Sequence, residues 1–263
     1  MRQTLTSQPE RVSESIEAYR ALIASFKSLY PKEIILVNPQ LVPEEVFDPI
    51  VARNRGYYAF PPVGLLYIAA VAKEVDPGIK IRLLDLNYDL LRLAHEENFS
   101  YSVWKDLLEN AIRSCEAPCV GVTCMFGATK PLFLDVSQWI REHFPTVPII
   151  AGGVQATYDA IELLEENYCD IVFRKEGEVQ FESFLKNCKD PSERKIPKGI
   201  SFRWEGKVFE LGKPDEPPPI EWDIRPFYKF IPIENYFKYG SLAAFSRYNG
   251  ADKPFATVLS NRG

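Results

Sequence analysis

Residues 147–188 read VPIIAGGVQATYDAIELLEENYCDIVFRKEGEVQFESFLKNC, and this stretch decides the fold class. Two short apolar runs, VPIIAGG (147–153) and CDIVFR (169–174), alternate with two amphipathic runs, TYDAIELLEENY (157–168) and GEVQFESFLKNC (177–188). The apolar runs predict strands buried on both faces, and the amphipathic runs predict helices. Such alternation is typical of a parallel sheet covered by helices.

The same rhythm extends upstream to residue 33. Strands are predicted over EIILVNP (33–39), IKIRLLDLN (79–87) and CVGVTCM (119–125), and helices over PVGLLYIAAVAKEV (62–75), YSVWKDLLENAIRSC (101–115) and PLFLDVSQWIREHF (131–144). Five successive strand–helix units predict an α/β fold: a doubly wound, five-stranded parallel sheet of the flavodoxin-like type.

The flanking segments follow other patterns. Residues 13–30 have the apolar spacing of a helix, with Ser13 or Ser15 as N-cap and Pro31 after it. After Cys188, KGISFRW and KVFEL predict a hairpin around Glu205-Gly206, and the Pro-rich stretch that follows predicts an ordered linker without regular helix or central strand. We therefore expect a helical segment (1–31), a Rossmann-like domain (32–190), a hairpin and linker (191–253), and the first strand of a truncated domain (254–263).

Composition narrows the functional classes. The chain of 263 residues has 31 Lys and Arg against 36 Asp and Glu, a net charge of −5, which argues against a broad basic face for nucleic acid. The longest apolar runs are too short for a membrane span, and the polar N-terminus lacks a signal-peptide core. Five cysteines, an odd number, favour a reducing cytoplasm over a disulfide framework. We expect a cytoplasmic protein with neither nucleic acid nor membrane as partner.

Four loops leave the carboxyl ends of the predicted strands, where open α/β sheets bind ligands. They are residues 38–64, 123–130, 152–159 and 174–180. Gly127, Gly152, Gly153 and Gly177 lie where the backbone either turns sharply or approaches a ligand closely. The pattern predicts a pocket for a flat ligand or a phosphate, unless these glycines only form tight strand–helix turns.

The spacing of these residues resembles a known signature. Thr123-x-Met125, 26 further residues (126–151) and then Gly152-Gly153 resemble the Ser-x-Leu … Gly-Gly half of the cobalamin-binding domain signature. PPVGLLYIAAVAKEV with KIRLLDLN, and IIAGGVQATYDAIELLEENYCDIVFRKEGEVQFESFL, are similar to the cobalamin-dependent radical S-adenosylmethionine enzymes. KGISFRWEGKVFEL, ENYFKYG and KPFATVLSNRG resemble the approach to the catalytic barrel of that family, so the resemblance covers residues 33–263 and the non-catalytic half.

This resemblance implies a cobalamin-binding domain without catalytic or metal-ligating residues of its own. The implied cofactor-binding residues are Asn38, Pro39, Gly64, Thr123, Met125, Gly127, Gly152, Gly153, Gln155, Ala156, Glu176, Gly177 and Glu178. In full-length members, a [4Fe-4S] cluster and S-adenosylmethionine generate a radical, and cobalamin supplies a methyl group or assists a cyclisation. The barrel is therefore an expected missing partner.

Two departures from related families bear on the chemistry. Residues 38–64 lack the Asp-x-His-x-x-G motif whose histidine ligates cobalt in mutases, and His95 and His143, the only two histidines, lie elsewhere. We therefore expect cobalamin to bind without a protein histidine ligand. The cluster motif Cys-x-x-x-Cys-x-x-Cys is also absent, so we expect the chain alone to lack radical activity.

Other interpretations remain open at this stage. A flavodoxin-like binding or regulatory module without corrinoid is the main alternative, and a dinucleotide or nucleotide-sugar enzyme using Asp85 is a weaker one, because the glycine fingerprint is missing. Cys115-x-x-x-Cys119 superficially resembles part of a cluster motif, but buried cysteines are the simpler reading. Glu176 with Glu178 suggest either an acid–base pair or a structural turn, and Arg53 with Arg55 either an anion site or a solvated loop.

Overall fold

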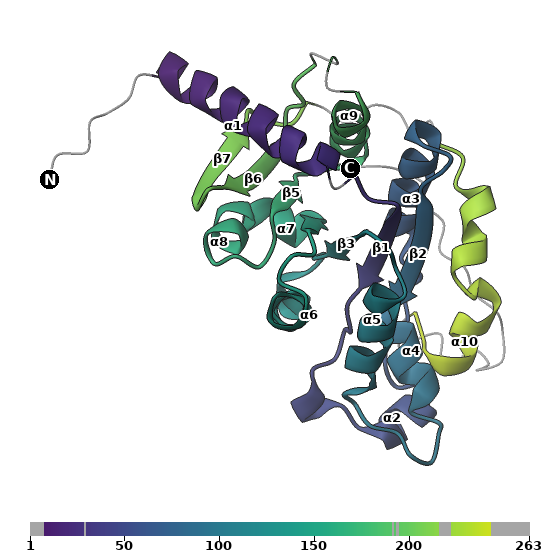
Figure 1. The fold of residues 1–263 in the computed structure, drawn as a ribbon. Coiled ribbons are helices and arrows are strands. Elements are labelled where there is room, and N and C mark those ends of the chain that lie inside the picture. The colour runs from purple at the N-terminus through teal and green to yellow at the C-terminus, as the bar shows by residue number, and fades with distance from the viewer. Residues whose placement is uncertain (1–7, 29, 191, 193–194, 216–221, 243–263) are drawn as a thin grey trace, which may run out of the picture.

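A computed structural model describes residues 8–28, 30–190, 192, 195–215 and 222–242. These residues form a seven-stranded sheet in the order β2-β1-β3-β4-β5-β6-β7 (Figure 1). Its strands are β1 (Glu33–Asn38), β2 (Lys80–Asp85), β3 (Pro118–Thr123), β4 (Ile149–Gly152), β5 (Ile171–Phe173), β6 (Ile200–Trp204) and β7 (Lys207–Leu211). The strands β1 to β5 are mutually parallel. Strand β6 pairs antiparallel with β5, and β7 pairs antiparallel with β6.

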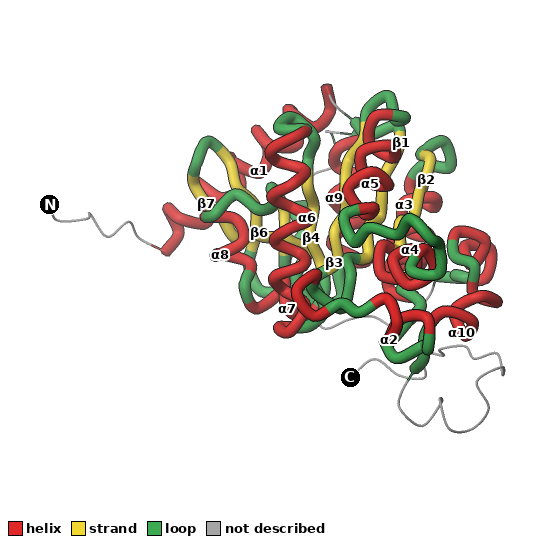
Figure 2. Tube along the Cα trace, turned by 90° about the horizontal axis from the view of Figure 1, so that it is seen from below, coloured by secondary structure: helices red, strands yellow, loops and turns green. Residues whose placement is uncertain are grey.

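Helices cover both faces of this sheet (Figures 1 and 2). The main ones are α1 (Gln8–Ser28), α3 (Val63–Val75), α4 (Leu86–Leu93), α5 (Val103–Arg113), α6 (Lys130–His143), α7 (Val154–Tyr158), α8 (Ala160–Glu165) and α9 (Glu178–Lys189). One core cluster joins α1, α3 and α9 to the sheet, and a second joins α5, α6 and α8 to the opposite face. The predicted α/β class, a mostly parallel sheet with helices on both faces, is confirmed.

The alternation of side chains along β1 explains why both faces need a helical layer. Ile34 and Leu36 belong to the core cluster with α3 and α9, whereas Ile35 and Val37 belong to the cluster with α5 and α6. All four are 1% exposed or less. Burial of each such side chain stabilises the fold by about 1.5–3 kcal/mol, so a central strand apolar on both faces requires this double cover.

The predicted hairpin extends the main sheet, so the expected count of five strands describes only its parallel part. Residue pairs Ile171↔Phe202 and Phe173↔Ile200 join β6 to β5 in antiparallel register. Both Ile200 and Phe202 are fully buried, because α1 covers them and ring contact with Tyr19 brings Phe202 into the core. A hairpin with a buried face gains from pairing with the exposed edge of β5.

Several element boundaries differ from the sequence-based predictions. The strand predicted over 79–87 ends at Asp85, which is the N-cap of α4 and accepts a hydrogen bond from Tyr88 N. The hydrophobic pattern did not predict helix α4. The predicted helix 157–168 is divided into α7 and α8, with a break at Asp159. Helix α1 begins at Gln8, before the expected serine caps, and loop 38–64 contains the short helices η1 (Glu44–Val46) and α2 (Pro49–Arg53).

The described part of the Pro-rich segment is more helical than predicted. It forms η3 (Arg225–Phe230), η4 (Ile233–Asn235) and the one-turn helix α10 (Tyr236–Tyr239). Tyr236 is fully buried against α4, and Phe227 and Phe230 pack on the cluster around α3, which confirms the expected apolar cover for these three aromatics. The strand predicted over 254–263 lies outside the described residues.

No helix among the described residues has the length and apolar character needed to cross a membrane.

Candidate cofactor cavity

A cavity of about 570 Å³ opens at the carboxyl ends of β1, β3, β4 and β5. Its walls come from the sheet on one side and from the first turns of α3 and α9 on the other. The strand order reverses between β1 and β3, because β2 lies beside β1 on one side and β3 on the other. The cavity therefore lies at the switch point where open α/β sheets bind ligands.

The inner wall is apolar, and a glycine keeps it open. Leu36, Gly121 and Ile150 are adjacent on three neighbouring strands, and all three line the cavity. A Cβ at Gly121 would lie 3.1 Å from Leu36 Cδ2 and 3.4 Å from Ile150 Cγ1. The glycine thus leaves a depression in the middle of an otherwise branched strand surface.

The two glycines after β4 have different physical roles. Gly153 has a φ of 106°, and a Cβ there would lie 2.6 Å from Cys124 O, so the backbone turn itself requires glycine. A Cβ at Gly152 would meet only Phe173 O at 3.8 Å, an ordinary contact, and its φ is not positive. The fold does not require glycine at position 152, where the missing side chain leaves free space in the cavity.

The rim carries exposed apolar side chains. Met125 is 42% exposed, Phe126 53% and Val154 54%, and all three line the cavity. Phe60 joins them and stacks on Tyr58 with 5.4 Å between ring centroids. Exposed apolar groups gathered around a cavity mouth are typical of a surface that a ligand or partner covers.

The structure brings most of the sequence-predicted site residues together. Those lining the cavity are Asn38, Pro39, Gly64, Thr123, Met125, Gly152, Gly153, Glu176, Gly177 and Glu178. Gly127, Gln155 and Ala156 do not line it. Ala156 is fully buried, and Gln155 Nε2 donates to Asp159 Oδ2 at 2.7 Å, so both side chains are engaged within the fold.

Sequence reasoning missed several lining residues, including Gln40, Phe60, Gly121, Lys175 and Phe181. A signal existed for Gly121, because glycine inside an apolar strand marks a close approach. Phe181 had no such signal: it lies one turn into α9, and only the packing of that helix on the sheet directs it to the cavity.

The other candidate site residues, Asp85, Arg53 and Arg55, make hydrogen bonds within the fold. Asp85 does not line the cavity; its buried carboxylate is enclosed by hydrogen bonds, so the ribose-binding alternative is not supported. Arg53 Nε donates to Ala94 O at 2.6 Å and Arg55 Nε to Gly240 O at 3.4 Å, which directs both guanidinium groups to backbone carbonyls. Glu176 and Glu178 both line the cavity.

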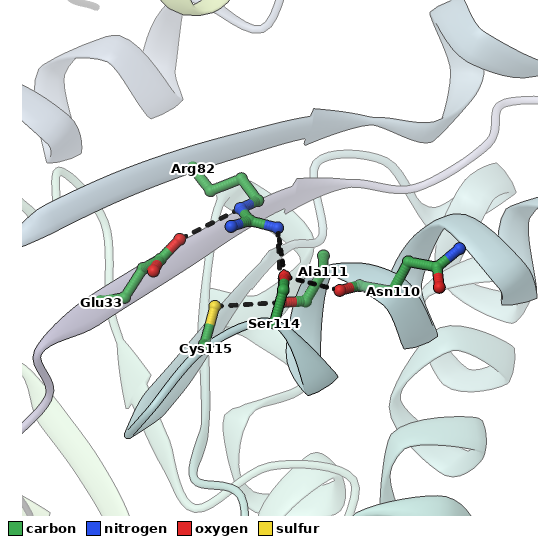
Figure 3. Close-up of polar contacts among 6 residues, drawn as sticks. All are labelled: Glu33, Arg82, Asn110, Ala111, Ser114 and Cys115. Carbon is green, nitrogen blue, oxygen red and sulfur yellow. Dashed lines mark hydrogen bonds and ion pairs between the residues drawn. The ribbon is translucent and has the colours of Figure 1, made fainter.

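The cysteines and histidines are also away from the cavity lining. Figure 3 shows Cys115 near the amino ends of β1 and β2, where its Sγ donates to Ala111 O at 3.0 Å, beside the Arg82–Glu33 ion pair. Burial raises the pKa of the Cys119 and Cys124 thiols to about 12, so both are neutral thiols near pH 7. His143 stacks on Trp139 at the end of α6, and His95 contacts Tyr239.

Comparison with known proteins identifies the class. Residues 50–185 match the B12 binding domain family, and this is more than half of the chain. The chain therefore belongs to the B12 binding domain family.

Individual relatives are more distant. The chain is 26% identical over 205 residues to "Uncharacterized methyltransferase PH0819" of Pyrococcus horikoshii, and 25% identical over 217 residues to "Anaerobic magnesium-protoporphyrin IX monomethyl ester cyclase" of Synechocystis sp.. The alignments cover 77% and 80% of this chain but only 38% of each relative, so the chain spans well under half of their length.

The fold is similar to that of a solved structure, the radical S-adenosylmethionine methyltransferase TsrM from Kitasatospora setae with cobalamin and a [4Fe-4S] cluster bound. The TM-score is 0.51 at 16% identity, over 73% of this chain and 31% of that one. This similarity concerns the fold.

Proposed function

We propose that this chain binds cobalamin in the cavity at the carboxyl edge of the sheet, as the cofactor-binding part of a cobalamin-dependent radical S-adenosylmethionine enzyme. Membership of the B12 binding domain family supports the ligand. The printed names of the relatives, a methyltransferase and a cyclase, support the enzyme class. The S-adenosylmethionine and [4Fe-4S] sites belong, on this proposal, to a catalytic barrel.

The observation that carries the proposal is the free space at Gly152. The fold tolerates a side chain there, yet the sequence has none, and the space opens onto an apolar cavity with an apolar rim. Ligand sites are typically apolar clefts with a few placed polar groups. The lining therefore fits a large ligand with extensive apolar surface better than a free phosphate, because its charged residues are one lysine against two glutamates.

The residues of this chain would bind and orient the cofactor. Gly64, Gly121 and Gly152 give the ligand access to the sheet and to α3, while Met125, Phe126 and Val154 offer apolar contact at the rim. Neither histidine lines the cavity, so the proposal includes no imidazole bond to cobalt. Bound cobalamin would supply the organometallic chemistry, and the protein its position.

Absorbance titration of the purified chain with hydroxocobalamin tests this proposal. We expect the wild type to retain about one equivalent through gel filtration and Gly152→Val to retain far less, because the valine fills cavity space. Gly78→Val is the matched control, since Gly78 lies in the turn before β2, outside the cavity, and the nearest atom to a Cβ there is the carboxylate oxygen Oδ1 of Asp76 at 3.1 Å. Retention of FMN in place of corrinoid, or equal corrinoid retention by wild type and Gly152→Val, would overturn the proposal.

A further inference from the structure

Two amide side chains lie at the carboxyl end of β1, and both line the cavity. Asn38 is the last residue of β1, and Gln40 follows two positions later. Gln40 is 2% exposed and lies in the wall between this cavity and a second one of about 260 Å³. Among the described residues, none hydrogen-bonds to the Gln40 side chain. Neither amide atom of Gln40 is among the fully buried polar atoms that lack a partner, so the amide keeps access to the cavity and can bond a ligand there.

Asp85 fixes the orientation of the Asn38 amide. Asn38 Nδ2 donates to Asp85 Oδ1 at 2.9 Å, and Asp85 also accepts from Tyr88 N at 3.1 Å and from Tyr236 Oη at 2.5 Å. An ionised carboxylate only accepts hydrogen bonds, so the amide nitrogen of Asn38 must face Asp85. The amide oxygen is left as an acceptor, and among the described residues none donates to it.

The charged residues of the lining add a second constraint. They are Lys175, Glu176 and Glu178, one positive charge against two negative ones. Glu178 is only 6% exposed, so its charge acts in a partly desolvated wall. A carboxylate that enters this cavity therefore meets a lining with more negative than positive side chains, whereas a carboxamide carries no charge.

We propose that Asn38, oriented by Asp85, and Gln40 select corrinoids whose edge carries neutral carboxamides over corrinoids with carboxylates at the same positions. The inference rests on the proposed cobalamin function and deepens it. A carboxamide donates an N–H to the Asn38 oxygen and can both donate to and accept from Gln40. A carboxylate has no hydrogen to donate, so its entry leaves the Asn38 acceptor unpaired. Asp85 acts here as a positioning residue.

The test compares cyanocobalamin with its monocarboxylic acids, in each of which one propionamide is hydrolysed. Dissociation constants are measured by calorimetry on the full chain. We expect wild type to bind cyanocobalamin at least about tenfold more tightly than one or more of the acids, the ratio that one unpaired hydrogen-bonding group produces. Gln40→Leu should weaken cyanocobalamin binding by about tenfold.

Asp85→Asn should reduce the amide-to-acid ratio toward one, because residue 85 can then donate to the Asn38 oxygen and let that amide turn. A merely structural role for Asp85 would weaken both ligands equally and leave the ratio unchanged. Asn38→Leu, which removes the acceptor, gives a second reading of the ratio should Asp85→Asn fail to fold by circular dichroism. Gln138→Leu is the matched control, an exposed glutamine on α6 that does not line the cavity.

The outcomes separate the two proposals. If wild type binds no corrinoid, the proposed function fails. If wild type binds cyanocobalamin and all of the acids equally well, or if none of the Asn38, Gln40 and Asp85 variants changes the ratio, amide selection is refuted while cobalamin binding stands.

Discussion

The buried carboxylate of Asp85 predicts a measurable pH dependence of stability. Burial raises the pKa of Asp85 from its ordinary 3.8 to about 6, although hydrogen bonds from Tyr236, Asn38 and Tyr88 act in the lowering direction. Because the folded state holds this proton more tightly than the unfolded state, the group's contribution is fully present below pH 3.8 and is lost as the pH rises through about 6. At about 1.4 kcal/mol per pKa unit, the pKa difference corresponds to a loss of about 3 kcal/mol.

Asp85→Asn removes the ionisation and should remove this loss. The assay is urea unfolding from pH 4 to pH 7.5 for wild type and variant, with the free energies of unfolding subtracted at each pH. Because part of the loss has already occurred at pH 4, we expect the difference between the two proteins to move by about 2 kcal/mol in favour of the variant across this range. The exposed Asp106→Asn on α5 is the control, and its difference from wild type should stay flat. Parallel curves for wild type and Asp85→Asn, or a difference that moves in the opposite direction, would refute the reasoning.

Three further predictions concern the same region. Tyr236→Phe removes the hydrogen bond from Tyr236 Oη to Asp85 Oδ2 and leaves a buried carboxylate with one donor fewer. We expect the free energy of unfolding in urea at pH 7.5 to fall by about 1–3 kcal/mol and the pKa of Asp85 to rise. An unchanged pH dependence of stability would contradict this prediction. Gly153→Ala should cost about 1–3 kcal/mol in the same assay because of the positive φ and the clash with Cys124 O, whereas Gly152→Ala should stay within about 0.5 kcal/mol of wild type; equal losses would show that the two glycines are not distinct. Gly121→Val should crowd Leu36 and Ile150 and lower the free energy of unfolding by about 1–3 kcal/mol. It should also weaken corrinoid retention. A variant that binds corrinoid as tightly as wild type would argue against a ligand at the inner wall.

The helical layers of this protein, and the edge of the sheet at which its cavity lies, were predictable from the amino-acid sequence. Strands such as EIILVN carry four successive apolar side chains, Ile34 to Val37, and only a sheet covered on both faces buries them all. The loops that follow such strands must meet at one edge, which is why ten of the thirteen predicted binding residues line a single cavity. The layers and the edge need only periodicity, which is a local property of the chain, whereas the individual binding residues came from the resemblance to the cobalamin-binding signature.

Features that depend on residues distant in sequence could not be predicted in this way. The hairpin carries no signal that it pairs with β5, since a free hairpin and a sheet extension have the same alternation. Gly152 and Gly153 are adjacent glycines that the sequence does not distinguish. The backbone oxygen of Cys124 leaves no room for a side chain at Gly153, whereas Gly152 faces open space. Asp85, Asn38 and Tyr236 are brought together from β2, β1 and α10, and their contact sets both the ionisation of the carboxylate and the direction of the amide. Desolvation and hydrogen-bond geometry arise from packing, so no pattern within a single segment contains them.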